Sequence, residues 1–222
     1  MTWKFVKLQD SSKNETARRK TSDSLAGKAK QFLEKIDVRL EIVKKQTLEI
    51  IRNIKDFRLP EKHEQVRVRT QSQINLISLV MLIVHERKVI DELTIATYTL
   101  NKEAFAILRS LLESGKIKKL NLLIASSYSF RDKDYFAFLK TKCLELSEKY
   151  HLKLIFAWLH FKITLARCGD DFYQFEGSMN YSTNNMAEQI LLCNSREVYE
   201  YDYALLTDFY KKLNNKSTEV VC

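Results

Sequence analysis

Apolar residues recur in steps of four and three over residues 29–57, with charged side chains at most of the positions between them. The stripe consists of Ala29, Leu33, Ile36, Leu40, Val43, Thr47, Ile50, Ile54 and Phe57. This spacing places the apolar side chains on one face of an α-helix. It predicts an amphipathic helix over 24–60 that ends at Pro60, because proline disfavours helical backbone at the residue before it. Such a helix can pair with a second chain or lie along its own domain, and the pattern fits both.

Beyond Pro60 the pattern alternates between short apolar runs and longer amphipathic ones. The predicted strands are 66–70, 93–100, 119–127 and 152–159, and the predicted helices between them are 74–87, 101–115 and 131–150. Asn101 is expected to cap its helix and Gly115 to end it. Nearly continuous apolar strands that alternate with helices are typical of an α/β sheet covered on both faces.

A different pattern follows near the end of the chain. Residues 162–178 form two alternating runs around Gly169 and two aspartates, which predicts a β-hairpin. One more strand is predicted at 188–194 and a closing helix at 196–213. We therefore expect three parts: a flexible basic N-terminus at 1–23, the long basic helix at 24–60, and an α/β domain at 61–222.

Composition narrows the setting of the protein. The four cysteines form no CxxC pair, which favours a reducing compartment over a disulfide framework. The first twenty residues lack the apolar core of a signal peptide. The longest apolar stretch, 74–84, is too short to cross a membrane. We therefore expect a cytoplasmic protein without a membrane partner.

The net charge of +9 is unevenly distributed. Residues 1–70 carry 18 Lys and Arg against 10 Asp and Glu, whereas the rest of the chain is nearly neutral. A basic front end favours a polyanionic partner such as nucleic acid. A solvated, lysine-rich helix would produce the same imbalance, so both interpretations stand.

Two pairs of polar residues share one spacing. His160 and Lys162 are two residues apart where two strand runs join, and Ser178 and Asn180 are two apart at the end of the returning hairpin strand. Residues i and i+2 of an extended chain project to the same side, and a hairpin would bring the two pairs together. Lysine supplies a charge, the amide and hydroxyl supply donors, and an imidazole can attack phosphorus. The pairs predict a phosphate site.

Gly177 and Glu188 complete this set. A glycine at 177 would let the backbone approach a ligand closely. The Glu188 carboxylate could accept the other imidazole N–H and hold the reactive tautomer of His160. The set contains no cluster of cysteines or carboxylates, so we expect neither a metal nor another cofactor.

The arrangement resembles the signature of the phospholipase D superfamily, H-x-K-x4-D followed by G-S-x-N and a later glutamate. It is carried here by His160, Lys162, Gly177, Ser178, Asn180 and Glu188. The resemblance spans about residues 66 to 213 and implies a phospholipase D-like mixed sheet flanked by helices. The chain departs from the signature at Arg167, where the family has aspartate, and in carrying one copy of the motif where many members carry two.

Similarity to the single-copy nucleases of the superfamily implies a function. It implies a metal-independent phosphodiesterase that cleaves DNA through a phosphohistidine, at a site shared by the two subunits of a homodimer. Arg167 leaves a first alternative open, a weak or inactive module of this fold that binds nucleic acid or protein. A lipid phosphodiesterase is the second alternative.

Overall fold

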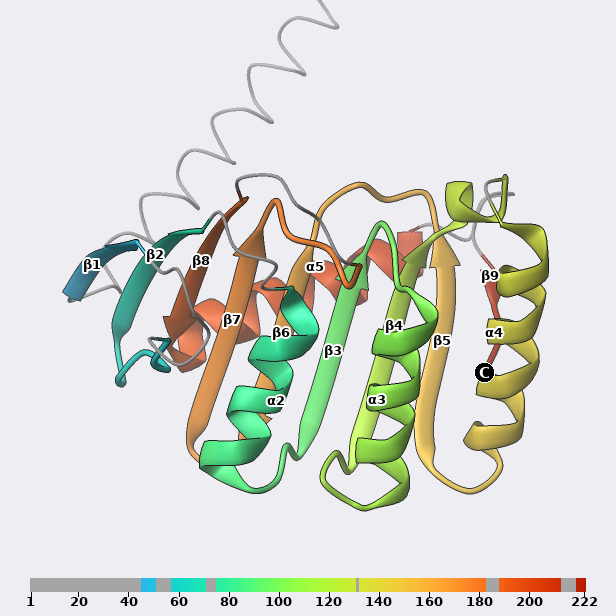
Figure 1. The fold of residues 1–222 in the computed structure, drawn as a ribbon, viewed down its shortest axis with the longest axis horizontal. Helices are drawn as coiled ribbons and strands as arrows, with labels where there is room; N and C mark the ends of the chain where they lie inside the picture. Colours follow the sequence, from blue (N-terminus) through green and yellow to red (C-terminus); the bar gives the residue numbers. More distant parts are fainter. Residues whose placement is uncertain (1–44, 51–56, 71–74, 131, 183–187, 213–218) are drawn as a thin grey trace, which may run out of the picture. The chain divides into compact units, whose positions relative to one another are not determined.

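The computed structural model describes residues 45–50, 57–70, 75–130, 132–182, 188–212 and 219–222. These residues lie in one unit that spans 42–222. Within them, nine strands form a single sheet in the order β1-β2-β8-β7-β6-β3-β4-β5-β9 (Figure 1). The predicted α/β class is confirmed.

The sheet is mixed. Its strands are β1 (Lys45–Ile50), β2 (Glu64–Thr70), β3 (Glu92–Thr97), β4 (Lys119–Ala125), β5 (His151–Ala157), β6 (Ile163–Cys168), β7 (Asp171–Gly177), β8 (Glu188–Asn194) and β9 (Glu219–Val220). Strands β3, β4 and β5 are parallel, as are β1 and β2, and all other neighbours are antiparallel. The last residues of β2, β3, β4, β5 and β7 therefore lie at the same end of the sheet as the first residues of β6 and β8.

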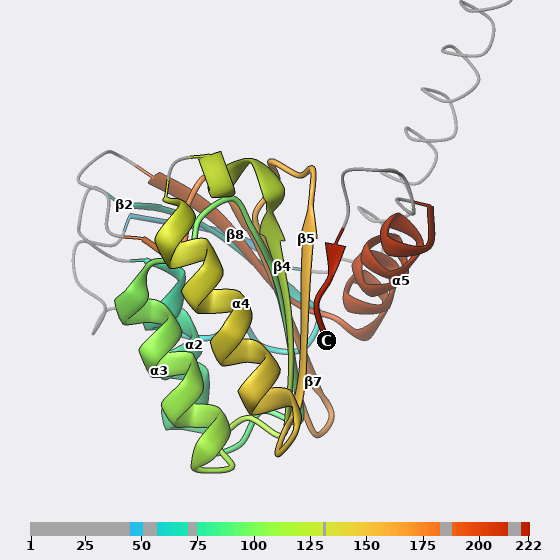
Figure 2. The same ribbon diagram turned by 90° about the vertical axis from the view of Figure 1, so that its right-hand side faces the viewer.

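Helices cover both faces of the sheet, as the sequence predicted. They are α2 (Leu76–Arg87), α3 (Lys102–Glu113), α4 (Lys133–Ser147) and α5 (Arg196–Lys212), with a short 3₁₀ turn η2 (Ser126–Phe130) after β4. Figure 2 shows α2, α3 and α4 on one face and α5 on the other. The buried apolar residues accordingly form two clusters. Leu79, Leu108 and Leu122 belong to the first cluster, and Leu165, Phe172 and Leu206 belong to the cluster under α5.

Side-chain caps begin three of the helices. Asn101 accepts a hydrogen bond from the Ala104 amide at 2.8 Å, and Asn75 and Asp132 make the equivalent bond at the starts of α2 and α4. Such a bond satisfies one of the amides that has no partner inside the helix. Gly115 follows α3 with a φ of 70°, a conformation that glycine adopts without strain. The predicted bounds of this helix are confirmed.

The predicted helix over 24–60 is wrong where the structure describes it. Residues 45–50 form strand β1, which pairs in parallel with β2 from Glu64 to Arg69. The outer edge of β2 offers a row of unpaired backbone groups, and pairing with that edge satisfies them in a way that a helix cannot. Residues 57–60 have no regular structure. The remainder of the predicted helix and the predicted N-terminus at 1–23 lie outside the described residues.

One connection shapes the end of the sheet at which β5 stops and β6 begins. Residues 158–162, here named the strap, link β5 to β6, and these two strands are separated in the sheet by β3 and β4. The strap therefore crosses the ends of β4 and β3 (Figure 1). We call this end of the sheet the strap end and the other the Glu92 end, after the first residue of β3.

Candidate active site

The strap presents His160 and Lys162. Its buried residue Leu159 is only 6% exposed and Phe161 is half-buried, and both pack into the apolar cluster under α5. His160 is exposed and Lys162 is half-buried. His160 and Lys162 line a hollow beside the strap, and so does Phe161. The Lys162 ammonium also donates to the His160 carbonyl oxygen at 3.2 Å.

A hollow of about 520 Å³ lies beside these two residues. Strands β2, β7 and β8 contribute to it together with the strap, and its lining residues are Arg67, His160, Phe161, Lys162, Glu176, Gly177, Gln189, Ile190 and Leu191. The Gly177 amide donates to the Lys162 carbonyl oxygen at 3.4 Å, so the returning hairpin strand does reach the strap. Arg67 and Lys162 bring two permanent positive charges to the hollow against the one carboxylate of Glu176. The arrangement favours an anion.

An aromatic ring packs against the imidazole. The ring centroids of Tyr98 and His160 are 5.1 Å apart, with the planes tilted by 53°. Tyr98 follows β3, which neighbours β6 with Ala96 opposite Ile163, so the sheet register brings it to the strap. Such a contact limits the orientations that the imidazole can adopt. Neither Tyr98 nor Arg67 was predicted as a site residue from the sequence. The alternation in "VRVRT" is the only signal for Arg67, and Tyr98 has none.

Ser178 and Glu188 hold the ends of β7 and β8 together. The Ser178 hydroxyl donates to the Glu188 carboxylate and accepts from the Gln189 amide at 3.1 Å. The Ser178 amide donates to the Gln189 carbonyl oxygen, also at 3.1 Å. The Glu188 carboxylate is 9% exposed and has this hydroxyl as a partner. Its predicted bond to the imidazole of His160 stays a prediction.

The backbone of β8 approaches Gly177 closely, whereas a ligand was predicted to do so. A Cβ at this position would lie 2.2 Å from the Gln189 carbonyl oxygen and 2.9 Å from the Ile190 Cα. The structure therefore requires glycine here because the backbone of β8 approaches, whereas the sequence analysis ascribed it to the approach of a ligand. The consequence for the site is indirect: glycine lets β8 and its Glu188 come up to the hairpin.

Asn180 lies in the segment after β7, beside helix α2 and outside the lining of the hollow. Its carbonyl oxygen accepts from the Leu76 amide at 3.4 Å. Its neighbours Met179 and Tyr181 are buried, and the Tyr181 hydroxyl lies 2.7 Å from that of Thr164. These contacts anchor the segment. The Asn180 Oδ1 is buried and has no hydrogen-bond partner among the described residues. A buried acceptor without a partner is uncommon in folded proteins.

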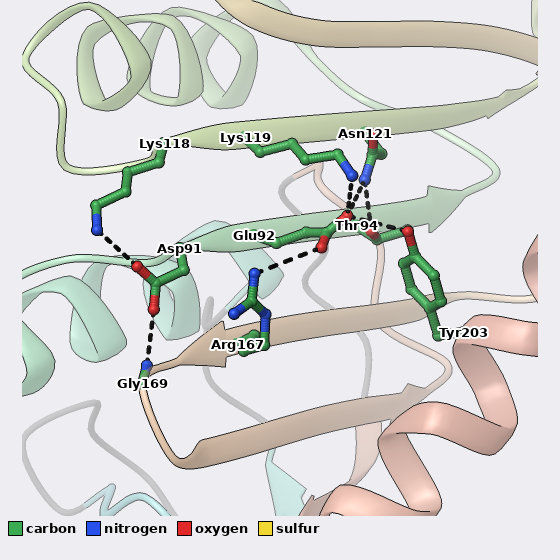
Figure 3. Close-up of polar contacts among 9 residues, drawn as sticks. All are labelled: Asp91, Glu92, Thr94, Lys118, Lys119, Asn121, Arg167, Gly169 and Tyr203. Carbon is green, nitrogen blue, oxygen red and sulfur yellow. Dashed lines mark hydrogen bonds and ion pairs between the residues drawn. The ribbon is translucent and has the colours of Figure 1, made fainter.

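Arg167 has a partner at the Glu92 end. It stands opposite Glu92 in the pairing of β6 with β3, and its guanidinium lies 3.8 Å from that carboxylate. Arg167 is five residues from Lys162, which corresponds to roughly 16 Å along a strand. The position at which the signature has aspartate is therefore remote from the hollow, and here the residue at it takes part in a polar cluster (Figure 3).

This Glu92 cluster is densely bonded. The Glu92 carboxylate accepts from Lys119 at 2.7 Å, from Asn121 at 3.0 Å and from the Tyr203 hydroxyl at 3.1 Å. Burial acts to raise the pKa of Glu92, but these donors and the charge of Lys119 outweigh it and hold the pKa below its ordinary value. Because Tyr203 comes from α5, the cluster also fastens that helix to the sheet.

Asp91 extends the cluster beside Glu92. Its carboxylate accepts from the Lys118 ammonium and from the Gly169 amide, both at 2.7 Å. The hydrogen bond from Lys118 is the main cause that lowers the pKa of Asp91, and the Gly169 amide adds to it. The second bond ties the turn between β6 and β7 to the start of β3.

The described residues contain no group of three or more His, Cys, Asp or Glu side chains placed to hold a metal ion. None of the helices in this part of the chain is both long and apolar enough to traverse a bilayer.

Known structures resemble this fold. A phosphatidylserine synthase from Haemophilus influenzae Rd KW20 matches with a TM-score of 0.51 and 14% identity, over 70% of this chain and 39% of that one. TrmBL2, an archaeal chromatin protein, matches with a TM-score of 0.43 and 11% identity, over 89% of this chain and 66% of that one. No family model and no curated protein matches the sequence. This chain spans about two fifths of the synthase, and that likeness supports a distant phospholipase D-like fold.

Proposed function

We propose that this chain is a metal-independent phosphodiesterase that cleaves DNA. The observation that carries the proposal is the hollow at the strap end, where His160 lies beside Arg67 and Lys162. An exposed imidazole next to two fixed cations has what attack on a phosphodiester needs, namely a nucleophile and positive charge for the phosphate oxygens.

Arg167 does not weaken this proposal. Its pairing with Glu92 at the far end of β6 gives it a structural explanation, so its presence is no sign of a damaged site. The main argument for a module that binds without cleaving was the missing aspartate of the signature, and that argument is now weaker. Such a module remains an outcome of the experiments below.

Covalent catalysis would proceed in two displacements. In the first, an imidazole nitrogen of His160 attacks phosphorus, the bond to the leaving oxygen breaks, and His160 of a second copy protonates that oxygen. In the second, water attacks phosphorus, the phosphorus–nitrogen bond breaks, and the second histidine takes the proton from the water. Lys162 and Arg67 would hold the negative charge in both transition states.

Ser178, Gly177 and Glu188 would act by position in this scheme. The bonds of Ser178 to β8 support the backbone beside the hollow, and Gly177 permits that contact. Asn180 would supply its amide to the phosphate or to the second copy. Its amide nitrogen is the group that would donate to a phosphate oxygen, whereas the buried Oδ1, an acceptor without a partner in the described residues, would need a donor from the second copy.

The pairing of two copies follows from the single motif in the chain, by resemblance to single-copy nucleases. A DNA substrate follows from the basic residues that precede the α/β domain and continue into it, since Arg67 and Arg69 project from β2 into solvent. Phosphate contacts of this kind make binding dependent on salt.

The decisive experiment is DNA cleavage in EDTA by the wild type and by His160→Ala. Loss of the nucleophile should lower the rate by about 10⁴-fold or more. His151→Ala, which removes another exposed histidine at the opposite end of β5, serves as the matched control and should cleave normally. An alkaline quench during turnover should leave labelled phosphate on His160. Unchanged cleavage by His160→Ala would end the proposal.

A mixing experiment tests the shared site. Wild-type and His160→Ala chains are unfolded, combined and refolded together in varied ratios. If each site needs two intact histidines, activity falls as the square of the wild-type fraction. A fall in direct proportion would show that one copy suffices.

The substrate panel separates the alternatives. Binding of DNA without cleavage would favour the binding module. Because the structural neighbour is named a phosphatidylserine synthase, the panel also includes phospholipid vesicles. Hydrolysis of lipid in place of DNA would favour the lipid phosphodiesterase.

A further inference from the structure

Trp158 occupies the first position of the strap. Its side chain is 65% exposed, an unusual state for the largest apolar side chain. The next residue, Leu159, is 6% exposed, and His160 is exposed again. Trp158 and His160 are thus exposed on either side of a buried leucine. The indole lies beside the candidate site and outside the lining of its hollow.

Trp158 is two residues from His160, the proposed nucleophile. Two residues of extended chain separate their Cα atoms by about 7 Å at most. Leu159 packs into the cluster under α5 and so holds the strap down between the exposed Trp158 and His160. A phosphodiester held at His160 and Lys162 would therefore carry its flanking base within reach of Trp158.

We propose that Trp158 is a stacking platform for one unpaired base next to the scissile phosphate, which makes single-stranded nucleic acid the substrate class of this site. The inference rests on the proposed phosphodiesterase function and adds the determinant of specificity. An exposed indole next to a cationic phosphate site is the combination with which proteins bind single strands, because every base offers a π-face. A paired base is stacked inside its duplex and cannot use the platform.

A lipid surface is a poorer match to the same residue. Binding to a membrane interface needs a band of apolar side chains. The other large apolar side chains that are exposed in the described residues come from α2, η2, α4, α5 and β9, and only η2 lies with the strap at the end of the sheet. Turn η2 follows β4 directly beside the end of β5, because Ala125 pairs with Ala157, and it carries the exposed Phe130. One such neighbour does not make a band.

Tryptophan emission measures this stacking directly. The chain has two tryptophans, and Trp3 lies outside the described residues, so a Trp3→Phe variant reports on Trp158 alone. A short oligothymidylate should quench the emission. An abasic oligomer with the same number of phosphates, or a duplex of the same length, should bind without quenching. Vesicles of anionic phospholipid should leave the emission unchanged, and a blue shift with vesicles alone would overturn the inference in favour of a lipid surface.

Cleavage measures the contribution of the platform. Trp158→Ala should raise KM for the oligothymidylate by about fivefold to a hundredfold, the range of base–aromatic stacking. Its KM for the abasic oligomer should not change, and Trp158→Phe should recover most of the loss. Phe138→Ala, which removes a 44% exposed aromatic side chain on α4, is the matched control and should behave as wild type.

The two proposals fail in different ways. Quenching by the oligothymidylate in a protein that cleaves nothing would overturn the phosphodiesterase and retain the platform. Cleavage of DNA with equal KM for Trp158→Ala and wild type would retain the phosphodiesterase and overturn the platform. The same holds if base-bearing and abasic oligomers bind equally well.

Discussion

The two ends of the central strands differ in how their charges are satisfied. At the Glu92 end, the Glu92 carboxylate has Lys119, Asn121 and Tyr203 as partners, and Asp91 has Lys118 and the Gly169 amide (Figure 3). At the strap end, the ammonium of Lys162 contacts a carbonyl oxygen, and Arg67 lines a hollow whose one carboxylate is that of Glu176.

This difference in charge pairing suggests that the Glu92 end stabilises the fold and that the strap end binds an anion. A carboxylate surrounded by donors, as at the Glu92 end, has little capacity left for a ligand, and its charge stabilises the fold. Arg67 and Lys162 face a hollow with one carboxylate, that of Glu176, so the hollow keeps a surplus of positive charge for an anion. Strands β3 and β6 run between the two ends, so one pair of neighbouring strands carries both arrangements. Mutations at the strap end should therefore lower activity and spare stability, and mutations at the Glu92 end should lower stability and spare activity.

The largest effect on activity among the supporting residues is expected at the strap end. Lys162→Met should lower kcat about 10²- to 10³-fold, because it removes fixed positive charge from the transition state. Its free energy of unfolding should change by no more than about 0.5 kcal/mol. Steady-state cleavage and urea unfolding measure the two quantities. Lys118→Met, at the Glu92 end, should leave cleavage unchanged, and equal loss in both variants would remove the distinction between the ends.

Gly177→Ala should be the most destabilising change near the hollow. The added Cβ would meet the backbone of β8, and relief requires the strands to move, at a cost of about 3 kcal/mol. Thermal and urea unfolding measure it. Gly115→Ala is the control, because its Cβ would meet nothing within 4 Å and only its positive φ is strained, worth about 1 kcal/mol. A neutral Gly177→Ala would show that β7 and β8 are not packed as described.

Glu92→Gln should lower stability and spare activity. The substitution removes the charge that Lys119 and Arg167 share, and hydrogen bonds to a charged group are worth about 1.5–3 kcal/mol. Glu113→Gln, in an exposed pair with Arg109, should change stability by less than about 0.5 kcal/mol. Urea midpoints compare them. If Glu92→Gln lost cleavage without losing stability, the Glu92 end would have a functional role after all.

The smallest expected effect is a difference in acid sensitivity. Asp91 and Glu92 have pKa values below their ordinary ones in the folded chain, so the unfolded chain binds protons more readily. Stability from these groups is complete above about pH 4 to 5, where the unfolded carboxyls are ionised, and is lost as the pH falls through the lower folded pKa values. Urea unfolding from about pH 6 to about pH 3 should show a shallower decline for Glu92→Gln than for wild type. Parallel declines would contradict the assignment.

Much of the fold was predictable because its signals are local. Helix α3 lies between Asn101 and Gly115 as expected, since a cap and a terminating glycine act within one turn. Strand β1 was not predictable. Its residues carry a helical stripe, and the edge of β2 that pairs with them is a tertiary feature that no local pattern records. The two-residue β9 was missed because it is too short to show alternation.

The candidate site was predictable in part. His160 and Lys162 line one hollow, and the hairpin does bring Gly177 to Lys162. Phe161, expected to point into the core, lines that hollow as well. The partner of Arg167 could not be predicted from the sequence. Glu92 lies 75 positions away, and only the pairing of β3 with β6 brings the two residues together. Trp158 escaped notice for another reason. It lies inside the apolar run 152–159, which predicts a buried strand, but β5 ends at Ala157 and Trp158 already belongs to the strap.

The strap also limits how the chain can evolve. It joins two anchors, Ala157 at the end of β5 and Ile163 at the start of β6, which are separated in the sheet by β3 and β4. Three strand spacings place these anchors about 14 Å apart, whereas six extended Cα steps reach about 21 Å at most. The strap can therefore lose no more than about two residues and still join the strands. Descendants of this chain should accept insertions in the strap more readily than deletions.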